Sequence, residues 1–78
     1  MKVLITGVTG FAGSHLLDYI TANHDARVYG THRPRSPLDF ISSPVTLIPC
    51  DITDPLAVVE AFRAVRPSLV FHLAAQSF

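Results

Sequence analysis

The feature that most constrains this chain is the stretch TGVTGFAG at residues 6–13, directly after the apolar run Val3–Ile5. Its three glycines, Gly7, Gly10 and Gly13, stand three residues apart. Where an apolar strand turns sharply into a helix, missing side chains let an anion approach the backbone N–H groups at the start of the helix. The stretch therefore predicts a strand, a tight turn with a phosphate site, and a helix.

The rest of the chain alternates strands with helices. β-Branched, apolar runs at 3–5, 27–31, 45–48 and 68–73 predict short buried strands. Helical spacing predicts one helix from Ala12 to Asn23 and another that begins at Pro55, with Asp54 as its cap, and ends before Pro67. Residues 33–44, which contain three prolines, form a loop. The pattern β-α-β-β-α-β predicts the α/β class, a Rossmann-type doubly wound parallel sheet with strand order 3-2-1-4.

The chain is short for such a fold. A sheet of order 3-2-1-4-5-6 needs two further strands, and the fourth strand would form an apolar edge with nothing beside it. We therefore expect residues 1–78 to be the N-terminal part of a dinucleotide-binding domain, without the rest of that domain or a substrate domain.

Composition excludes several classes of protein. Six basic and six acidic side chains cancel, which argues against a nucleic-acid partner. The single cysteine, Cys50, rules out an internal disulfide and predicts a small buried side chain, and no histidine has the spacing of a metal site. No run approaches the ~20 apolar residues of a membrane span, and the N-terminus lacks the core of a signal peptide. These features predict a cytoplasmic protein with no membrane anchor.

Each glycine has an expected role. Gly7 permits the turn, Gly10 lets the backbone approach a pyrophosphate, and Gly13 lets the helix pack closely. The spacing is G-x-x-G-x-x-G instead of G-x-G-x-x-G, and a triphosphate-binding loop is excluded because no lysine follows Gly13. The alternative is that the glycines serve only the turn and the packing.

The second strand bears on the cofactor. NAD sites carry an acidic residue about 20 residues after the glycines, which accepts from the ribose 2′-hydroxyl. No acidic residue occurs from Ala26 to Leu38, and the strand runs into Arg33, Arg35 and Ser36. Two guanidiniums and a hydroxyl suit a 2′-phosphate. The sequence therefore predicts NADP, unless both arginines are solvated loop residues.

The ends of the third and fourth strands supply further candidates. Asp51 and Ile52 lie where adenine would bind, although Asp51 could instead be a turn or capping carboxylate. Small residues after Leu73 suggest close approach of a ligand to the backbone. His72 lies within an apolar run, so we expect a hydrogen-bonded core histidine and not an acid–base group.

Three motifs in this order resemble the extended short-chain dehydrogenase/reductase family of NAD-dependent epimerases and dehydratases: TGVTGFAGSHL, CDITDP and FHLAAQS. GTHRPRS and HLAAQS are similar to the GDP-mannose 4,6-dehydratase branch. The resemblance places Gly7, Gly10 and Gly13, with Thr9 and Phe11, at the pyrophosphate. It places Arg33, Arg35 and Ser36 at the 2′-phosphate, Asp51 and Ile52 at adenine, Leu73, Ala74 and Ala75 at the ribose side, and Gln76 and Ser77 near the substrate.

The same resemblance implies an activity for the parent protein. It would convert GDP-mannose to GDP-4-keto-6-deoxymannose with NADP as an internal hydride shuttle, and we expect a homo-oligomer. The family's catalytic Tyr-x-x-x-Lys pair is not in these residues, so we expect none of them to be catalytic and this part alone to be inactive. The alternatives are a 4-keto-6-deoxymannose reductase, another nucleotide-sugar epimerase or dehydratase, and a non-catalytic NADP-sensing module.

Overall fold

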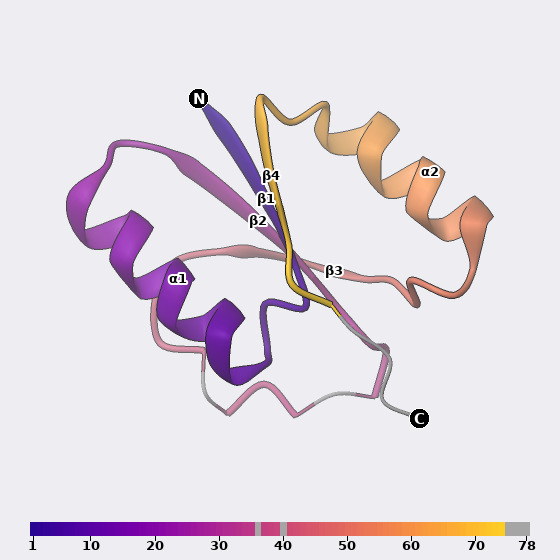
Figure 1. Ribbon diagram of the computed structural model, residues 1–78, viewed down its shortest axis with the longest axis horizontal. Helices are drawn as coiled ribbons and strands as arrows, with labels where there is room; N and C mark the ends of the chain where they lie inside the picture. The colour runs from indigo at the N-terminus through magenta and orange to yellow at the C-terminus, as the bar shows by residue number, and fades with distance from the viewer. Residues whose placement is uncertain (36, 40, 75–78) are drawn as a thin grey trace.

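A computed structural model describes residues 1–35, 37–39 and 41–74. In chain order, its elements are β1 (Lys2–Thr6), α1 (Phe11–Asn23), β2 (Arg27–His32), β3 (Thr46–Pro49), α2 (Pro55–Val65) and β4 (Leu69–His72) (Figure 1). Each predicted strand and helix is present, with ends that agree or differ by one residue.

The strands form one parallel sheet in the order β3-β2-β1-β4. β1 is central and pairs with β2 from Lys2↔Arg27 and with β4 from Val3↔Leu69. Because all the strands are parallel, their carboxyl ends meet at one edge, where open α/β sheets bind ligands. The predicted fold class and strand order are confirmed.

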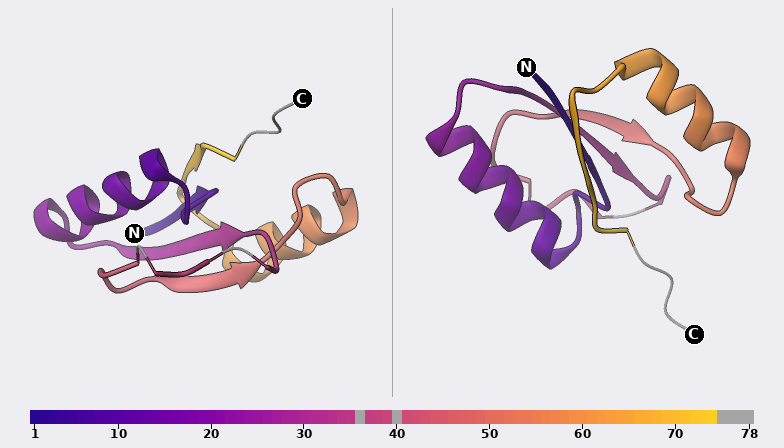
Figure 2. Two further views of the ribbon diagram at one scale, coloured as in Figure 1. Left: turned by 90° about the horizontal axis from the view of Figure 1, so that it is seen from below. Right: turned by 45° about the horizontal axis from the view of Figure 1, so that its top comes forward.

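Successive side chains of β1 point to opposite faces of the sheet, and one helix covers each face. Val3 and Ile5 belong to the core cluster that Leu17 and Ile20 of α1 complete. Thr6 lies on the other face, where it lines a cavity with residues of α2. The right-hand view of Figure 2 shows the strands passing between the two helices. Both faces of β1 are covered, which explains its continuous apolar sequence.

The two helices begin in different ways. The Asp54 carboxylate accepts from the backbone N–H groups of Leu56 and Ala57 at 3.1 and 3.4 Å, and Pro55 occupies the first turn of α2. α1 starts at Gly10 with no side-chain cap and no acidic residue in its first turn. The residue after α2, Arg66, caps its C-terminus with a left-handed φ of 51° and directly precedes Pro67.

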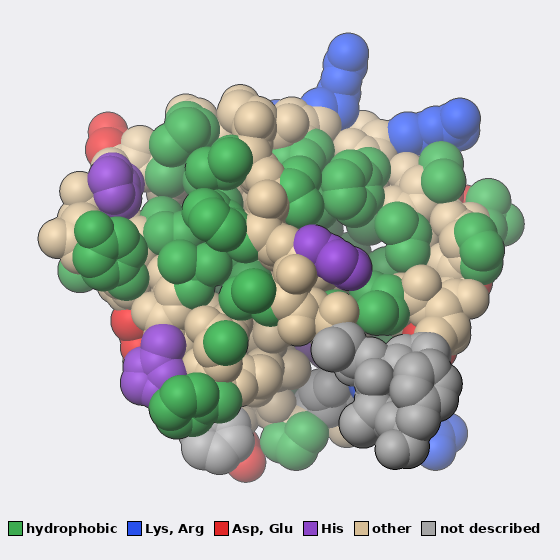
Figure 3. All heavy atoms as spheres, in the orientation of Figure 1, with side chains coloured by type: hydrophobic (Ala, Val, Ile, Leu, Met, Phe, Trp, Pro, Cys, Tyr) green, Lys and Arg blue, Asp and Glu red, His purple; other side chains and the backbone are tan. Residues whose placement is uncertain are grey.

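Strand β4 lies at an edge of the described sheet, and its side chains are more exposed than a core strand's. Leu69 and Val70 of this strand are exposed hydrophobic side chains, and Figure 3 shows hydrophobic side chains gathered in patches on this face of the molecule. The expectation of a core histidine is wrong in one respect: His72 is exposed, although it is hydrogen-bonded. Cys50 is buried, as expected. No helix in the described ranges combines the length and apolarity that crossing a membrane requires.

Candidate functional site

The site is built around the turn that joins β1 to α1. Gly7 has a φ of +70°, and its carbonyl accepts from the Gly10 N–H at 3.1 Å, which closes the turn. A Cβ at Gly7 would lie 2.8 Å from the Cα of Ala74, after β4. The turn therefore requires glycine for its backbone angle and for its packing.

The other two glycines of the motif differ in what surrounds them. A Cβ at Gly13 would overlap the Gly7 carbonyl and lie 2.8 Å from the Cα of Val8, so Gly13 allows α1 to start close to the turn. A Cβ at Gly10 would have only the Gly7 carbonyl near it, at 3.4 Å. Packing within the described residues thus explains Gly7 and Gly13 but leaves Gly10 without a structural requirement.

The first turn of α1 has the properties of an anion site. Its N–H groups carry the positive end of the helix dipole, and no side chain caps them. In α2 the Asp54 carboxylate fills the equivalent place and would repel an anion. Of the two helices, only α1 offers its N-terminus to a negatively charged ligand.

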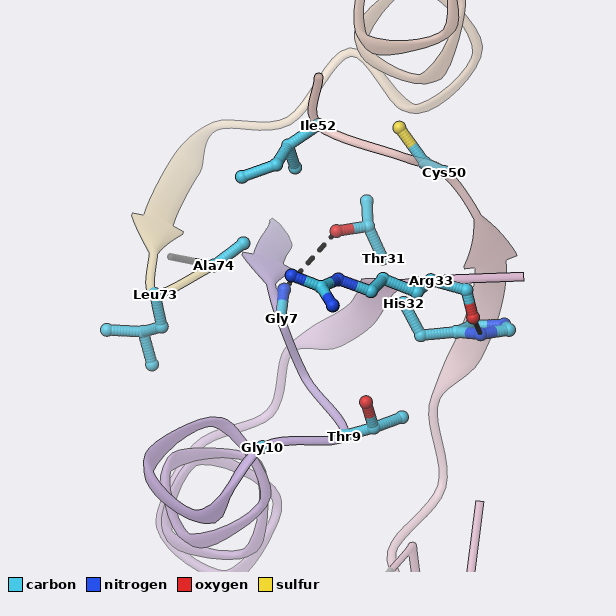
Figure 4. Close-up of a pocket in the computed structure, with 10 residues that line it drawn as sticks. All are labelled: Gly7, Thr9, Gly10, Thr31, His32, Arg33, Cys50, Ile52, Leu73 and Ala74. Carbon is cyan, nitrogen blue, oxygen red and sulfur yellow. Dashed lines mark hydrogen bonds between the residues drawn. The ribbon is translucent and has the colours of Figure 1, made fainter. Parts of the chain in front are cut away.

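A cavity of about 360 Å³ opens in front of this turn (Figure 4). On one side lie Gly7, Thr9 and Gly10; on the other, the Arg33 side chain extends across the cavity toward the turn. The lining residues come from the carboxyl ends of all four strands and the loops that follow them. They are Gly7, Thr9, Gly10, Thr31, His32, Arg33, Cys50, Ile52, Leu73 and Ala74.

Thr31 ties the glycine turn to the end of β2. Its hydroxyl accepts from the Gly7 N–H at 3.3 Å, and its carbonyl accepts from the Val8 N–H at 3.0 Å. The neighbouring His32 is buried, with Nδ1 2.8 Å from the Arg33 carbonyl. Since a carbonyl only accepts, Nδ1 carries the proton. These bonds fix the wall from which Arg33 extends.

Thr6 ties the same turn to the end of β4. It is buried, and its Oγ1 lies 3.0 Å from the Leu73 nitrogen, 3.2 Å from the Ala74 nitrogen and 2.8 Å from Nδ1 of His72. The partners are 66 to 68 residues away in the chain. Thr6 thus holds β4's end against Gly7.

The sequence matches the NAD dependent epimerase/dehydratase family over residues 3–78. The chain belongs to this family. It is 34% identical over 84 residues to a probable dTDP-glucose 4,6-dehydratase of Sinorhizobium fredii, covering 99% of this chain and 24% of that protein. It is 38% identical over 81 residues to a GDP-mannose 4,6-dehydratase of Sordaria araneosa, covering 97% and 15%. The chain thus spans about a quarter or less of these curated relatives.

A solved structure of the family agrees with the fold. The UDP-glucose 4-epimerase of Thermus thermophilus, solved in complex with NAD, aligns with a TM-score of 0.78 and 33% identity, over 99% of this chain and 25% of that one. The family resemblance predicted from the three motifs is confirmed.

Within this epimerase/dehydratase chain, Asp51 does not line the cavity, although Cys50 and Ile52 on either side of it do. Its Oδ1 accepts from the backbone N–H of Thr53 at 2.9 Å and from the Thr53 hydroxyl at 2.7 Å. The hydroxyl and then the N–H hold the pKa of Asp51 below its ordinary value, and Arg33 lowers it further. This carboxylate therefore shapes the turn before α2, the alternative that the sequence left open; its predicted contact with adenine remains a prediction.

The cavity brings together seven of the predicted site residues: Gly7, Thr9, Gly10, Arg33, Ile52, Leu73 and Ala74. Four others do not line it: Phe11, Gly13, Arg35 and Asp51. Ser36, Ala75, Gln76 and Ser77 were also predicted and lie outside the described residues. Within the described ranges, no three His, Cys, Asp or Glu side chains cluster as metal ligands do.

Sequence reasoning missed Thr31, His32 and Cys50 as lining residues. Their position in the sequence could have indicated them, because each lies at or directly after the carboxyl end of a predicted strand, where parallel sheets bind ligands. Burial raises the pKa of the Cys50 thiol, and the carboxylates of Asp54 and Asp51 raise it further. The thiol is thus an uncharged part of the wall at neutral pH.

Proposed function

We propose that this chain forms the adenosine-diphosphate side of an NADP site in a nucleotide-sugar 4,6-dehydratase. One observation carries the proposal: the uncapped start of α1, beside the glycine turn, faces Arg33 across a single cavity of about 360 Å³. An anion at the turn and a second anion at the guanidinium match a dinucleotide with a pyrophosphate and a 2′-phosphate.

The residues present fit that ligand. Gly10 leaves the approach to the turn open, so a pyrophosphate could accept from the N–H groups that begin α1. Arg33 would hold the 2′-phosphate, with Arg35 and Ser36 from the same loop. Ile52, Leu73 and Ala74 would lie along the adenosine.

The end of β2 supports NADP over NAD. Thr31, His32 and Arg33 line this part of the cavity, and none carries a carboxylate that would accept from a ribose 2′-hydroxyl or repel a 2′-phosphate. The Thermus thermophilus epimerase, which binds NAD, supports the nicotinamide dinucleotide. The preference for the phosphorylated form depends on Arg33.

The two curated relatives described above support dehydration as the reaction, since both are named as 4,6-dehydratases. GDP-mannose is the substrate that we propose, because of the similarity of GTHRPRS and HLAAQS to that branch. With the dinucleotide held by the glycine turn and Arg33, its nicotinamide would supply a reversible hydride acceptor: the hydride removed from C4 of the sugar would be returned at C6 after water is lost across C5–C6. The chain's own residues would bind and orient the dinucleotide, and the catalytic groups and the oligomer contacts would lie in other parts of the protein.

Two measurements on the full-length protein test this proposal: calorimetry of cofactor binding, and the absorbance of the cofactor during turnover. We expect saturable NADPH binding that is tighter than NADH binding, and conversion of GDP-mannose with no net change in the absorbance of the cofactor. Stoichiometric loss of NADPH absorbance would favour a reductase, and inversion at C4 would favour an epimerase. Binding without turnover of any nucleotide sugar would favour an NADP-sensing module.

A further inference from the structure

The hydroxyl of Thr6 has three hydrogen-bond partners, and it can bond to all three only when one of them, His72, is an acceptor. A threonine oxygen accepts two hydrogen bonds and donates one. The N–H groups of Leu73 and Ala74 point to Thr6 Oγ1 at 3.0 and 3.2 Å, and each can only donate. With both acceptor positions filled, the hydroxyl proton is left for Nδ1 of His72, 2.8 Å away.

This count fixes the state of the imidazole. Nδ1 must accept, so it carries no proton, and the neutral ring is protonated at Nε2. A protonated His72 would make Nδ1 a third donor to Thr6 Oγ1. It would then compete with the N–H groups of Leu73 and Ala74 for the two acceptor positions of that oxygen. The Leu73 N–H could fall back on the Thr6 carbonyl, 3.2 Å away, but the Ala74 N–H has only the hydroxyl among the bonds of the described residues.

We infer that His72 is a positioning residue for the dinucleotide site: in its neutral form it orients the Thr6 hydroxyl so that Ala74 is held against Gly7. The inference rests on the proposed function for the identity of the ligand. The contact it protects is tight, because the space between Gly7 and Ala74 has no room for one methyl group. Both residues line the cavity, so loosening β4's end would disturb the wall where a dinucleotide would bind.

The surroundings of His72 place no carboxylate of the described residues beside its ring. His72 lines a second cavity of about 230 Å³ between the sheet and α2, whose other lining residues are apolar, hydroxyl-bearing or thiol side chains of β1, β2, α2 and the segment between β3 and α2. The other titratable group of this lining is the Cys50 thiol, whose pKa burial raises. The charged residues of α2, Glu60 and Arg63, are exposed and do not line it. No described carboxylate therefore meets an imidazolium here.

The test measures NADP affinity between pH 7.5 and pH 5.5 on the full-length protein, by calorimetry. His72→Asn is the matched variant, because its Oδ1 can accept the Thr6 hydroxyl in place of Nδ1 and does not titrate. His72→Phe removes the acceptor. One lost hydrogen bond corresponds to about a 3- to 10-fold change in affinity.

We expect the wild-type affinity to fall by about that factor on acidification relative to His72→Asn, and His72→Phe to be weaker at neutral pH by a similar factor. The comparison with His72→Asn is needed because the cofactor's own phosphate also titrates, near pH 6. Equal pH profiles for the wild type and His72→Asn would overturn the inference.

A ¹⁵N NMR measurement on histidine-labelled protein tests the tautomer without any ligand. We expect Nδ1 of His72 to give the signal of an unprotonated nitrogen at neutral pH, and a protonated Nδ1 would overturn the inference. Should NADP fail to bind at any pH while Nδ1 is unprotonated, the proposed function fails and the hydrogen-bond arrangement stands.

Discussion

A β-carbon added at Gly7 would lie 2.8 Å from the Cα of Ala74, although the two residues are 67 positions apart in the chain. The turn after the first strand and the end of the fourth strand are therefore packed backbone to backbone. The candidate site depends on this contact, because the two segments form adjoining parts of the cavity.

Gly7→Ala should therefore destabilise the protein. The substitution places a side chain at a φ of +70° and into the Ala74 backbone, and such strain costs on the order of 2–4 kcal/mol in the free energy of unfolding. Urea denaturation of the full-length protein measures it. Gly10→Ala is the control, with an expected change of less than about 1 kcal/mol, because a Cβ there would meet only the Gly7 carbonyl, at 3.4 Å. A Gly7→Ala variant as stable as the wild type would contradict the described turn.

Arg33→Ala should weaken NADPH binding by about 10- to 100-fold and leave NADH binding nearly unchanged, since only the 2′-phosphate loses its charged partner. Calorimetry with both cofactors gives the ratio. Arg35→Ala should have a smaller effect because Arg35 does not line the cavity, and Arg63→Ala on α2 should have none. An equal loss of affinity for NADPH and for NADH would show that Arg33 does not bind the 2′-phosphate.

Asp54→Ala should lower the free energy of unfolding by about 1 kcal/mol, because it removes the carboxylate that caps α2. Asp54→Asn keeps an acceptor oxygen and should stay close to the wild type. Thermal or urea unfolding distinguishes the two variants. If both lost the same stability, the charge of Asp54 and not its cap would be the relevant property.

Cys50 should make the protein less stable as the pH rises above about 9. Burial raises the folded-state pKa of this thiol above its ordinary value near 9.0. The unfolded chain therefore ionises first, and the stabilisation present below that value is lost as the pH climbs toward the folded pKa. Unfolding free energies at pH 7 and pH 10 should differ less in Cys50→Ala than in the wild type. A larger difference between the two pH values in Cys50→Ala than in the wild type would contradict this prediction.

Much of the fold could be predicted because it follows from local patterns. The β-branched runs, the Asp54-Pro55 helix start and the glycine spacing each act within a few residues, and each element they predicted is present. The roles of Gly7 and Gly13 could also be assigned, since the tight turn between β1 and α1 itself restricts side chains at both positions.

The missed features depend on contacts between distant segments. Gly30 has no room for a Cβ because the side chain of Val8 packs against it. Thr6 accepts a hydrogen bond from Leu73 at the end of β4. Neither contact can be predicted from a short stretch of sequence, because its partners lie far apart in the chain. His72 was expected in the core because it lies in an apolar run, but its strand is an edge of the described sheet. Asp51 differs from these cases, because it bonds to Thr53 only two residues away, in the local turn that the sequence had left open as an alternative.

The most direct test of the central claim is calorimetry of NADPH binding to the full-length protein and to Gly10→Val. The glycine turn and the start of α1 are proposed to bind the pyrophosphate, and Gly10 is the position where a side chain meets little of the protein but would meet the ligand. We predict that the wild type binds NADPH and that Gly10→Val, still folded although its helix start is less favourable, binds it at least about 10-fold more weakly. No NADPH binding by the wild type, or equal affinity in Gly10→Val, would contradict the claim.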